Sequence, residues 1–152
     1  MMPTGAVLDA RQVLAGTPAE VGGKAWQLAR LRHFGLPVPD FVVLPATAWQ
    51  PAAPDRSPEV FAALRATLAA RGWLDRPLAV RSSAVGEDGA AASFAGIFRS
   101  CLNVCGEDAL RQAVAEVRAS LHTPAADAYR ERLGLHGEPA MAVIVMPLIA
   151  AR

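Results

Sequence analysis

This chain of 152 residues has few cysteines, almost no excess of positive over negative charge, and no long apolar segment. Its two cysteines, Cys101 and Cys105, are too few for a disulfide framework or for a four-ligand metal site of their own. Lys and Arg number 15 and Asp and Glu number 14, which leaves a net charge of +1. Such a balance provides no broad electrostatic surface for nucleic acid or for an anionic membrane, so we expect neither partner.

Apolar runs are also short. The longest, from Ala140 to Ala151, is interrupted by Pro147 and falls well below the ~20 residues of a membrane-spanning helix. The N-terminal residues include Asp9, Arg11 and Glu20 and show no apolar segment of the kind found in signal peptides. We therefore expect a cytoplasmic protein with no membrane segment.

Apolar residues make up 53% of the chain and charged residues 19%. This composition is sufficient for a substantial core in one domain. Hydrophobic spacing and the positions of Gly and Pro predict alternating helices and strands. The expected helices cover residues 22–35, 58–72, 110–121 and 125–133, and the expected strands cover 41–44, 78–81, 97–104 and 140–149. This order indicates an α/β or α+β domain with a mixed sheet and flanking helices. The continuous apolar run of the last strand is typical of a strand covered on both faces.

The first motif with residues suited to bind a ligand is Val21-Gly22-Gly23-Lys24, at the start of a predicted helix. Adjacent glycines allow a close backbone approach, helix N-terminal amides favour an anion, and Lys24 adds a full positive charge. The pattern lacks the remaining residues of a Walker A loop. Spacing alone therefore leaves two interpretations open, a phosphate site and an ordinary turn with a helix cap.

The second motif is Val80-Arg81-Ser82-Ser83-Ala84, followed by Glu87 and Asp88 and then by Ser93-Phe94-Ala95-Gly96. An arginine at the end of an apolar strand needs a partner, because an unpaired charge near a core is unfavourable. One of the two acidic residues is a sufficient partner. The alternative is a phosphate, which the guanidinium group binds in a forked geometry and which the amides of the glycine-containing turn also favour.

Together the two motifs resemble a known family. The segments VGGKAWQLARLRHFGLPVPDFVVLPATAW, LAVRSSAVGEDGAAASFAGIFRSCLNV, AYRERLG and AMAVIVMPLI follow the same order as in the N-terminal nucleotide-binding domain of phosphoenolpyruvate synthase. Pyruvate phosphate dikinase and rifampicin phosphotransferase share that domain. The resemblance covers nearly the whole chain and is weakest around residues 51–57.

The resemblance implies the N-terminal part of an ATP-grasp fold that binds ATP with Mg²⁺. Members of the family pass a phosphoryl group from ATP to a carrier histidine and on to pyruvate or a related acceptor. By the same resemblance, Lys24 contacts the nucleotide phosphates, and Arg81 is the catalytic residue that holds the phosphoryl group in transfer. Gly96 supplies a close backbone approach, and Ser100 occupies the position of a phosphate-contacting threonine. These roles suit a reaction that depends on positioning and charge neutralisation.

The chain departs from the family pattern in two ways. Met146 stands where the family usually has a glutamine that contacts adenine, and methionine packs on a purine without offering amide hydrogen bonds. Residues 1–152 would also stop before the second ATP-grasp subdomain with its metal ligands, and before the phosphohistidine domain. We therefore expect no metal ligand within this chain, and we expect the rest of the machinery in missing C-terminal domains or a separate chain.

Two other functions stay open at this stage. One is a non-catalytic module, derived from the same family, that binds a nucleotide or a protein partner. The other is a structural remnant that docks on a relative through an exposed edge of its last strand. Whether the chain acts as an enzyme is therefore undecided from its residues, and we expect nucleotide binding without turnover by the chain alone.

Overall fold

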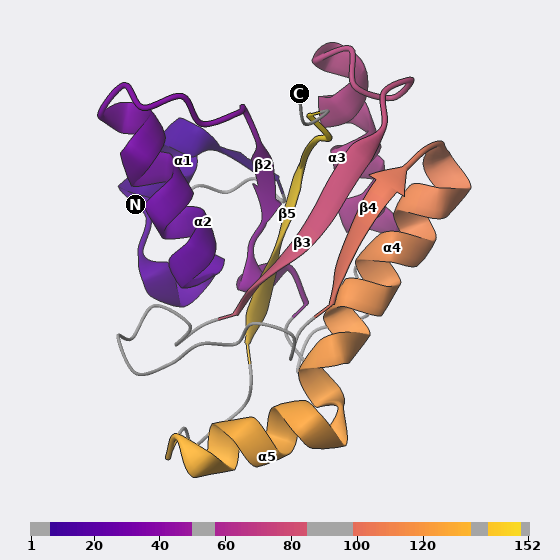
Figure 1. Cartoon of the computed structure of the whole chain (residues 1–152). Coiled ribbons are helices and arrows are strands. Elements are labelled where there is room, and N and C mark those ends of the chain that lie inside the picture. The colour runs from indigo at the N-terminus through magenta and orange to yellow at the C-terminus, as the bar shows by residue number, and fades with distance from the viewer. Residues whose placement is uncertain (1–6, 50–56, 85–98, 135–139, 150–152) are drawn as a thin grey trace.

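The computed structural model describes residues 7–49, 57–84, 99–134 and 140–149. Twelve elements occur in these ranges (Figure 1). The strands are β1 (Leu8–Asp9), β2 (Val42–Leu44), β3 (Leu78–Ala84), β4 (Ser100–Val104) and β5 (Met141–Pro147). The α-helices are α1 (Ala10–Ala15), α2 (Pro18–His33), α3 (Ser57–Ala70), α4 (Glu107–Ala119) and α5 (Pro124–Arg132). Two short 3₁₀ helices are η1 (Ala46–Trp49) and η2 (Ser120–His122).

The five strands form one open sheet in the order β1-β2-β5-β3-β4. The α+β class expected from the sequence is confirmed, but the expected mixture of strand directions is not, since each of the four pairings is antiparallel. The reason is the position of β5. It enters the sheet between β2 and β3, so these two parallel strands are not neighbours (Figure 1).

Strand β5 is the centre of the fold. All seven of its residues are buried, as expected for a strand covered on both faces. It pairs with β2 on one side and with β3 on the other, in a register that places Ile144 opposite both Val43 and Arg81. The hypothesis that the last strand offers an exposed edge is therefore wrong. The edges of the described sheet are β1 and β4.

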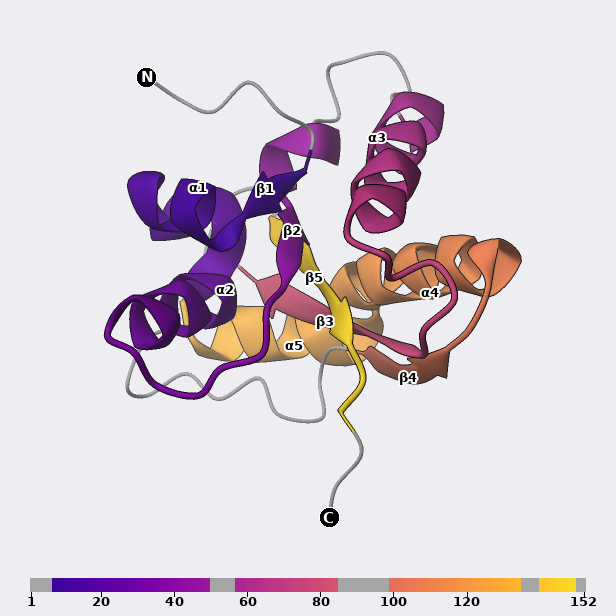
Figure 2. The same ribbon diagram turned by 90° about the horizontal axis from the view of Figure 1, so that it is seen from above.

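Helices cover the two faces of the sheet separately, so the view from above shows three layers (Figure 2). Helices α1 and α2 pack on one face through Val13, Val21, Ala25 and Ala29, and we call this core the α1–α2 cluster. Helices α3 and α4 pack on the other face, and we call that core the α3–α4 cluster. Within the described ranges, no helix is long and apolar enough to cross a membrane.

The local reasons for these elements follow from capping and periodicity. Asp9 and Gln12 form a reciprocal capping box at the start of α1. Thr123 accepts a hydrogen bond from the amide of Ala126 and caps α5, whose first residue is a proline. Each predicted helix and strand is present among the described residues, and residues 97 and 98 of the predicted strand 97–104 lie outside them. The largest boundary difference is in α2, which begins at Pro18 and contains Gly22 as a break inside it.

Candidate functional site

The Gly22 break in α2 places the glycine pair against strand β3. Gly22 has φ 77° and ψ 163°, a conformation that is essentially restricted to glycine. A Cβ atom on Gly22 would lie 2.1 Å from the Ser83 carbonyl oxygen and 2.4 Å from its Oγ atom. The close backbone approach expected from the two glycines is thus made to β3. This close approach allows α2 to pack directly on the sheet.

The side chain of Ser83 stabilises the contact between α2 and β3 at this break. It is fully buried, and its hydroxyl donates a hydrogen bond to the Val21 carbonyl at 2.6 Å. The same oxygen accepts a hydrogen bond from the Ala25 amide at 3.0 Å. The sequence motifs did not single out Ser83 as a functional residue. The one signal for it was its position, because it follows Arg81 by two residues in the same strand and must share its face.

Lys24 lies directly after this glycine pair and reaches toward the same part of β3. Its side chain is half-buried, and its ammonium group donates a hydrogen bond to the Ser82 carbonyl at 3.0 Å. Because Ser82 is the chain neighbour of Arg81, the fold brings together two cations that belong to separate motifs of the sequence.

Arg81 projects from the face of β3 that contacts α2. Along this strand Leu78, Val80 and Ala84 pack into the α3–α4 cluster, whereas Ala79 packs into the α1–α2 cluster, so the odd-numbered residues share the α2 side. Arg81 itself is exposed, and its guanidinium has no hydrogen bond or ion pair with a described residue. An exposed guanidinium that no described residue engages is suited to a phosphate.

Ser100 is the cross-strand partner of Arg81. The two residues are paired in the β3–β4 register, and both are exposed. Leu102, two residues along the edge strand, is 63% exposed, whereas Cys101 between them packs against the α3–α4 cluster. Among the described residues, the α2 face of the sheet is therefore uncovered at β4. The side chains exposed on this face are those of Arg81, Ser100 and Leu102.

Met146 lies on the same face but is not exposed. It is paired with Ala79 in the β3–β5 register, and its exposed fraction is 8% within the α1–α2 cluster. Along β3 the order is therefore Met146 beside Ala79, then Ser100 beside Arg81, then Lys24 near Ser82 and Ser83. From Ala79 to Ser83 the strand rises about 14 Å at ~3.4 Å per residue.

The last of the predicted site residues, Gly96, lies outside the described residues, as do Glu87 and Asp88, the acidic residues weighed as partners of Arg81. Within the residues described, no group of three or more His, Cys, Asp or Glu side chains is placed to hold a metal ion. The part of the site that the structure describes thus carries cations and hydroxyls and no metal-binding cluster.

Strand β4 is held in place by polar contacts that Arg99, just before it, makes with α4 and η2. The Arg99 amide donates to the Ser120 hydroxyl at 3.1 Å, and its Nε donates to Glu116 at 2.9 Å. Gln112 also donates to Glu116, at 3.1 Å. The hydrogen bond from Gln112, followed by the positive charge of Arg99, lowers the pKa of the Glu116 carboxyl. These contacts fix the backbone immediately before Ser100.

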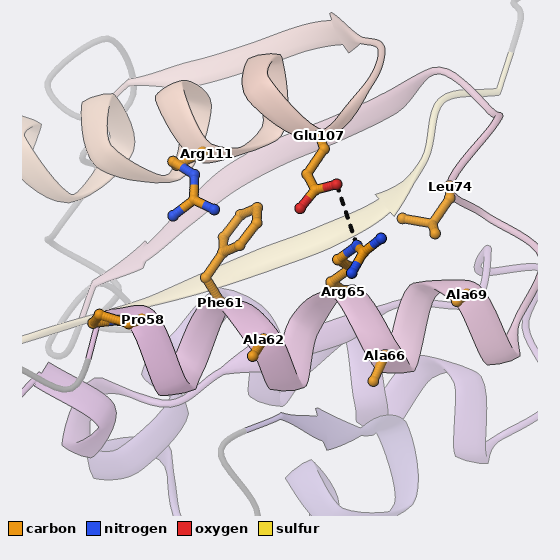
Figure 3. A pocket seen from close by; sticks show the side chains of 9 residues that line it. All are labelled: Pro58, Phe61, Ala62, Arg65, Ala66, Ala69, Leu74, Glu107 and Arg111. Atoms are coloured by element: carbon orange, nitrogen blue, oxygen red, sulfur yellow. Dashed lines mark ion pairs between the residues drawn. The ribbon is translucent and has the colours of Figure 1, made fainter.

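A separate pocket of about 420 Å³ lies between α3 and α4, on the opposite side of the sheet (Figure 3). Its floor is formed by small residues of α3, and charged side chains rim it. Arg65 is paired with Glu107 at 3.2 Å, and the Arg111 guanidinium stacks 4.1 Å from the centre of the Phe61 ring. Both arginines have partners within the described part of the chain, whereas Arg81 has none there. The cluster of predicted site residues on the other face is the better candidate for an anion.

Comparison with protein families identifies the family of the chain. Residues 52–152 match the family described as the pyruvate phosphate dikinase AMP/ATP-binding domain. This chain belongs to that family. The resemblance inferred from the motifs is thereby confirmed. The matched range includes Arg81, Ser100 and Met146, whereas Lys24 precedes it.

Curated relatives support the same family. The phosphoenolpyruvate synthase of Aeropyrum pernix is 45% identical over 76 residues, which are 49% of this chain and 9% of that protein. The probable phosphoenolpyruvate synthase of Archaeoglobus fulgidus is 44% identical over 73 residues, 47% of this chain and 10% of the relative. A rifampicin phosphotransferase of Streptomyces is 41% identical over 95 residues, 62% of this chain and 11% of the relative. The chain thus matches about a tenth of the length of these proteins.

Proposed function

We propose that this chain binds the phosphates of ATP around the exposed Arg81 and Ser100, on the α2 face of β3 and β4, as the first part of an ATP-grasp site. The observation that carries the proposal is the exposed Arg81 guanidinium, which lies opposite Ser100 and next to the Lys24–Ser82 contact. Two cations and a hydroxyl on one face form a suitable surface for a polyphosphate. Membership of an AMP/ATP-binding family supports the same ligand.

The direction of the nucleotide follows from the order of residues along β3. The cations lie toward the Ser83 end of the strand, and Met146 lies beside Ala79, closer to the other end. We propose that the phosphates occupy the Lys24 and Arg81 end and that the base lies toward Met146. Met146 is 8% exposed, so its thioether would give a purine only a small apolar contact and no hydrogen-bond readout, and discrimination of adenine from guanine would be weak.

The chemistry that we propose for the whole protein is phosphoryl transfer from ATP to a carrier histidine and then to pyruvate or a related acceptor. Arg81 would bind the transferred phosphoryl group and neutralise its charge, and Lys24 would hold the neighbouring phosphates. Bound Mg²⁺ would supply further charge neutralisation. Following the family resemblance, we propose that its ligands and the carrier histidine lie in further domains or in a separate chain.

A protein-binding role for the same face is the second candidate. It is favoured by Leu102, whose 63% exposed side chain lies on the edge strand beside Ser100. A module of this kind would use Arg81 to bind an acidic group of a partner. It would not distinguish ATP from AMP.

Calorimetric titration of the chain with ATP and with AMP, each with and without Mg²⁺, tests the proposal. We expect ATP to bind, and we expect Arg81→Ala to weaken ATP about tenfold or more, because charge-assisted hydrogen bonds contribute about 1.5–3 kcal/mol. The loss should be smaller for AMP, which lacks the terminal phosphates. Arg11→Ala is the matched control, since Arg11 is exposed on α1, which follows β1 at the sheet edge opposite to β4. Absence of binding at millimolar ATP, or equal affinities of the two variants, would contradict the proposal.

A further inference from the structure

The Ser83 hydroxyl occupies the place of a missing helix hydrogen bond. In a continuous α-helix the amide of Ala25 would donate to the carbonyl of Val21, four residues earlier. The break at Gly22 separates these two groups, and the Ser83 Oγ atom lies between them. It donates to Val21 at 2.6 Å and accepts from Ala25 at 3.0 Å. A side chain of β3 thus completes the hydrogen-bond ladder of α2.

The Ser83 hydrogen bonds hold the chain at Val21 and at Ala25, and Lys24 lies between these two residues. Lys24 is the chain neighbour of Ala25, and Gly22 and Gly23 on its other side are buried against β3. The backbone of this segment is held at Val21 and Ala25 by one oxygen atom, and the Lys24 ammonium group is held by the Ser82 carbonyl. Rotation of α2 relative to β3 would break both Ser83 hydrogen bonds and displace Lys24 from Arg81.

We propose that Ser83 is a positioning residue for nucleotide binding, which sets the place of Lys24 relative to Arg81 by bridging the break in α2. The inference rests on the proposed function of the Lys24 and Arg81 pair. Ser83 does not itself contact the nucleotide, because it is fully buried under α2. Its effect on the ligand passes through the backbone of residues 21–25.

The neighbouring Ser82 provides a matched control within the same strand. Its exposed fraction is 2% against 0% for Ser83, so both hydroxyl groups are buried. Ser82 is paired with Val143, which belongs to the α3–α4 cluster, and its side chain therefore faces away from α2. Lys24 binds the backbone carbonyl of Ser82, which Ser82→Ala leaves in place.

The test is a double-variant cycle on ATP affinity, measured by calorimetry with the four chains wild type, Lys24→Ala, Ser83→Ala and the double variant. We expect Ser83→Ala to weaken ATP about tenfold, as misplacement of a binding group does, and Ser82→Ala to leave the affinity unchanged. The double variant should bind ATP no more weakly than Lys24→Ala alone, because Ser83 acts through Lys24. A role confined to stability would not produce this non-additivity.

Circular dichroism establishes that each variant is folded at the temperature of the titration. If Ser83→Ala does not fold, Ser83→Cys replaces it, because a thiol makes longer and weaker hydrogen bonds at the same position and should still weaken ATP binding. A folded Ser83 variant that binds ATP as tightly as Ser82→Ala would overturn the inference and leave the proposed function intact. Additive losses in the double variant would overturn it as well. Failure of the wild-type chain to bind ATP would instead remove the proposed function.

Discussion

Arg81 and Ser100 are directly opposite each other in the antiparallel pair of β3 and β4, and both side chains are exposed on the face of the sheet that carries α2. The pairing brings residues nineteen positions apart in the sequence to one place. A strand pair sets the separation of two side chains more narrowly than a loop does. In the function that we propose, the guanidinium and the hydroxyl would contact the same phosphate.

Ser100→Ala should weaken ATP binding modestly. A neutral hydrogen bond contributes about 0.5–1.5 kcal/mol, which corresponds to roughly a twofold to twelvefold loss of affinity. Calorimetric titration measures it, and Ser100→Thr is the control, since it keeps the hydroxyl and restores the residue usual in the family. Because Ser100 is exposed, neither change should alter stability appreciably. Equal ATP affinities for the Ala and Thr variants would remove Ser100 from the site.

Gly22→Ala should destabilise the chain far more than Gly35→Ala. Both glycines have a positive φ, of 77° and 82°, so each substitution introduces backbone strain of about 1–3 kcal/mol. A Cβ atom on Gly35 meets nothing within 4 Å, whereas on Gly22 it lies 2.1 Å from the Ser83 carbonyl oxygen. Overpacking of this kind adds about 1–3 kcal/mol or prevents folding.

Urea unfolding of the two variants measures the difference between these glycines. The free energy of unfolding should fall clearly further for Gly22→Ala. Similar losses for both would show that α2 moves away from β3 without penalty, and would contradict the close packing of this helix on the strand.

Met146→Gln should destabilise the chain although glutamine is the residue usual in the family. Met146 is 8% exposed and packs in the α1–α2 cluster, so a glutamine amide would be buried among apolar groups at about 1–3 kcal/mol. Met146→Leu keeps the volume and should stay under about 1.5 kcal/mol. Thermal and urea unfolding compare the two variants. A neutral effect of Met146→Gln would mean that the position offers the amide a polar partner.

Acid should weaken the attachment of β4 to α4. The pKa of Glu116 is lowered in the folded chain, first by the hydrogen bond from Gln112 and then by the charge of Arg99. A carboxyl with a lowered pKa stabilises the fold above its unfolded pKa, and this contribution is lost as pH falls through the folded value. Glu116→Gln removes the titration. Unfolding measured from neutral to acidic pH should therefore show a steeper decline for the wild type, and parallel curves would contradict the role of this carboxyl.

The sequence predicted the elements well because their signals are local. Leu110, Val114, Val117 and Leu121 recur at helical spacing and are all buried at α4 and η2, and the apolar run of β5 is buried along its whole length. The expectation of a strand free at its edge was wrong, since local patterns carry no information about which strands become neighbours. The place of β5 between β2 and β3 results from packing of distant segments.

The candidate site also has one part that the sequence predicted and another that only the tertiary structure determined. Residue type and motif order made Lys24 and Arg81 candidates for a phosphate site, because a phosphate favours cations whatever the fold, and the family resemblance added Ser100. Only the tertiary structure determined that Lys24 reaches Ser82, that Arg81 pairs with Ser100, and that Ser83 bridges the break at Gly22. These contacts join residues about twenty to sixty positions apart, and their geometry depends on strand register and on how closely a helix approaches a sheet.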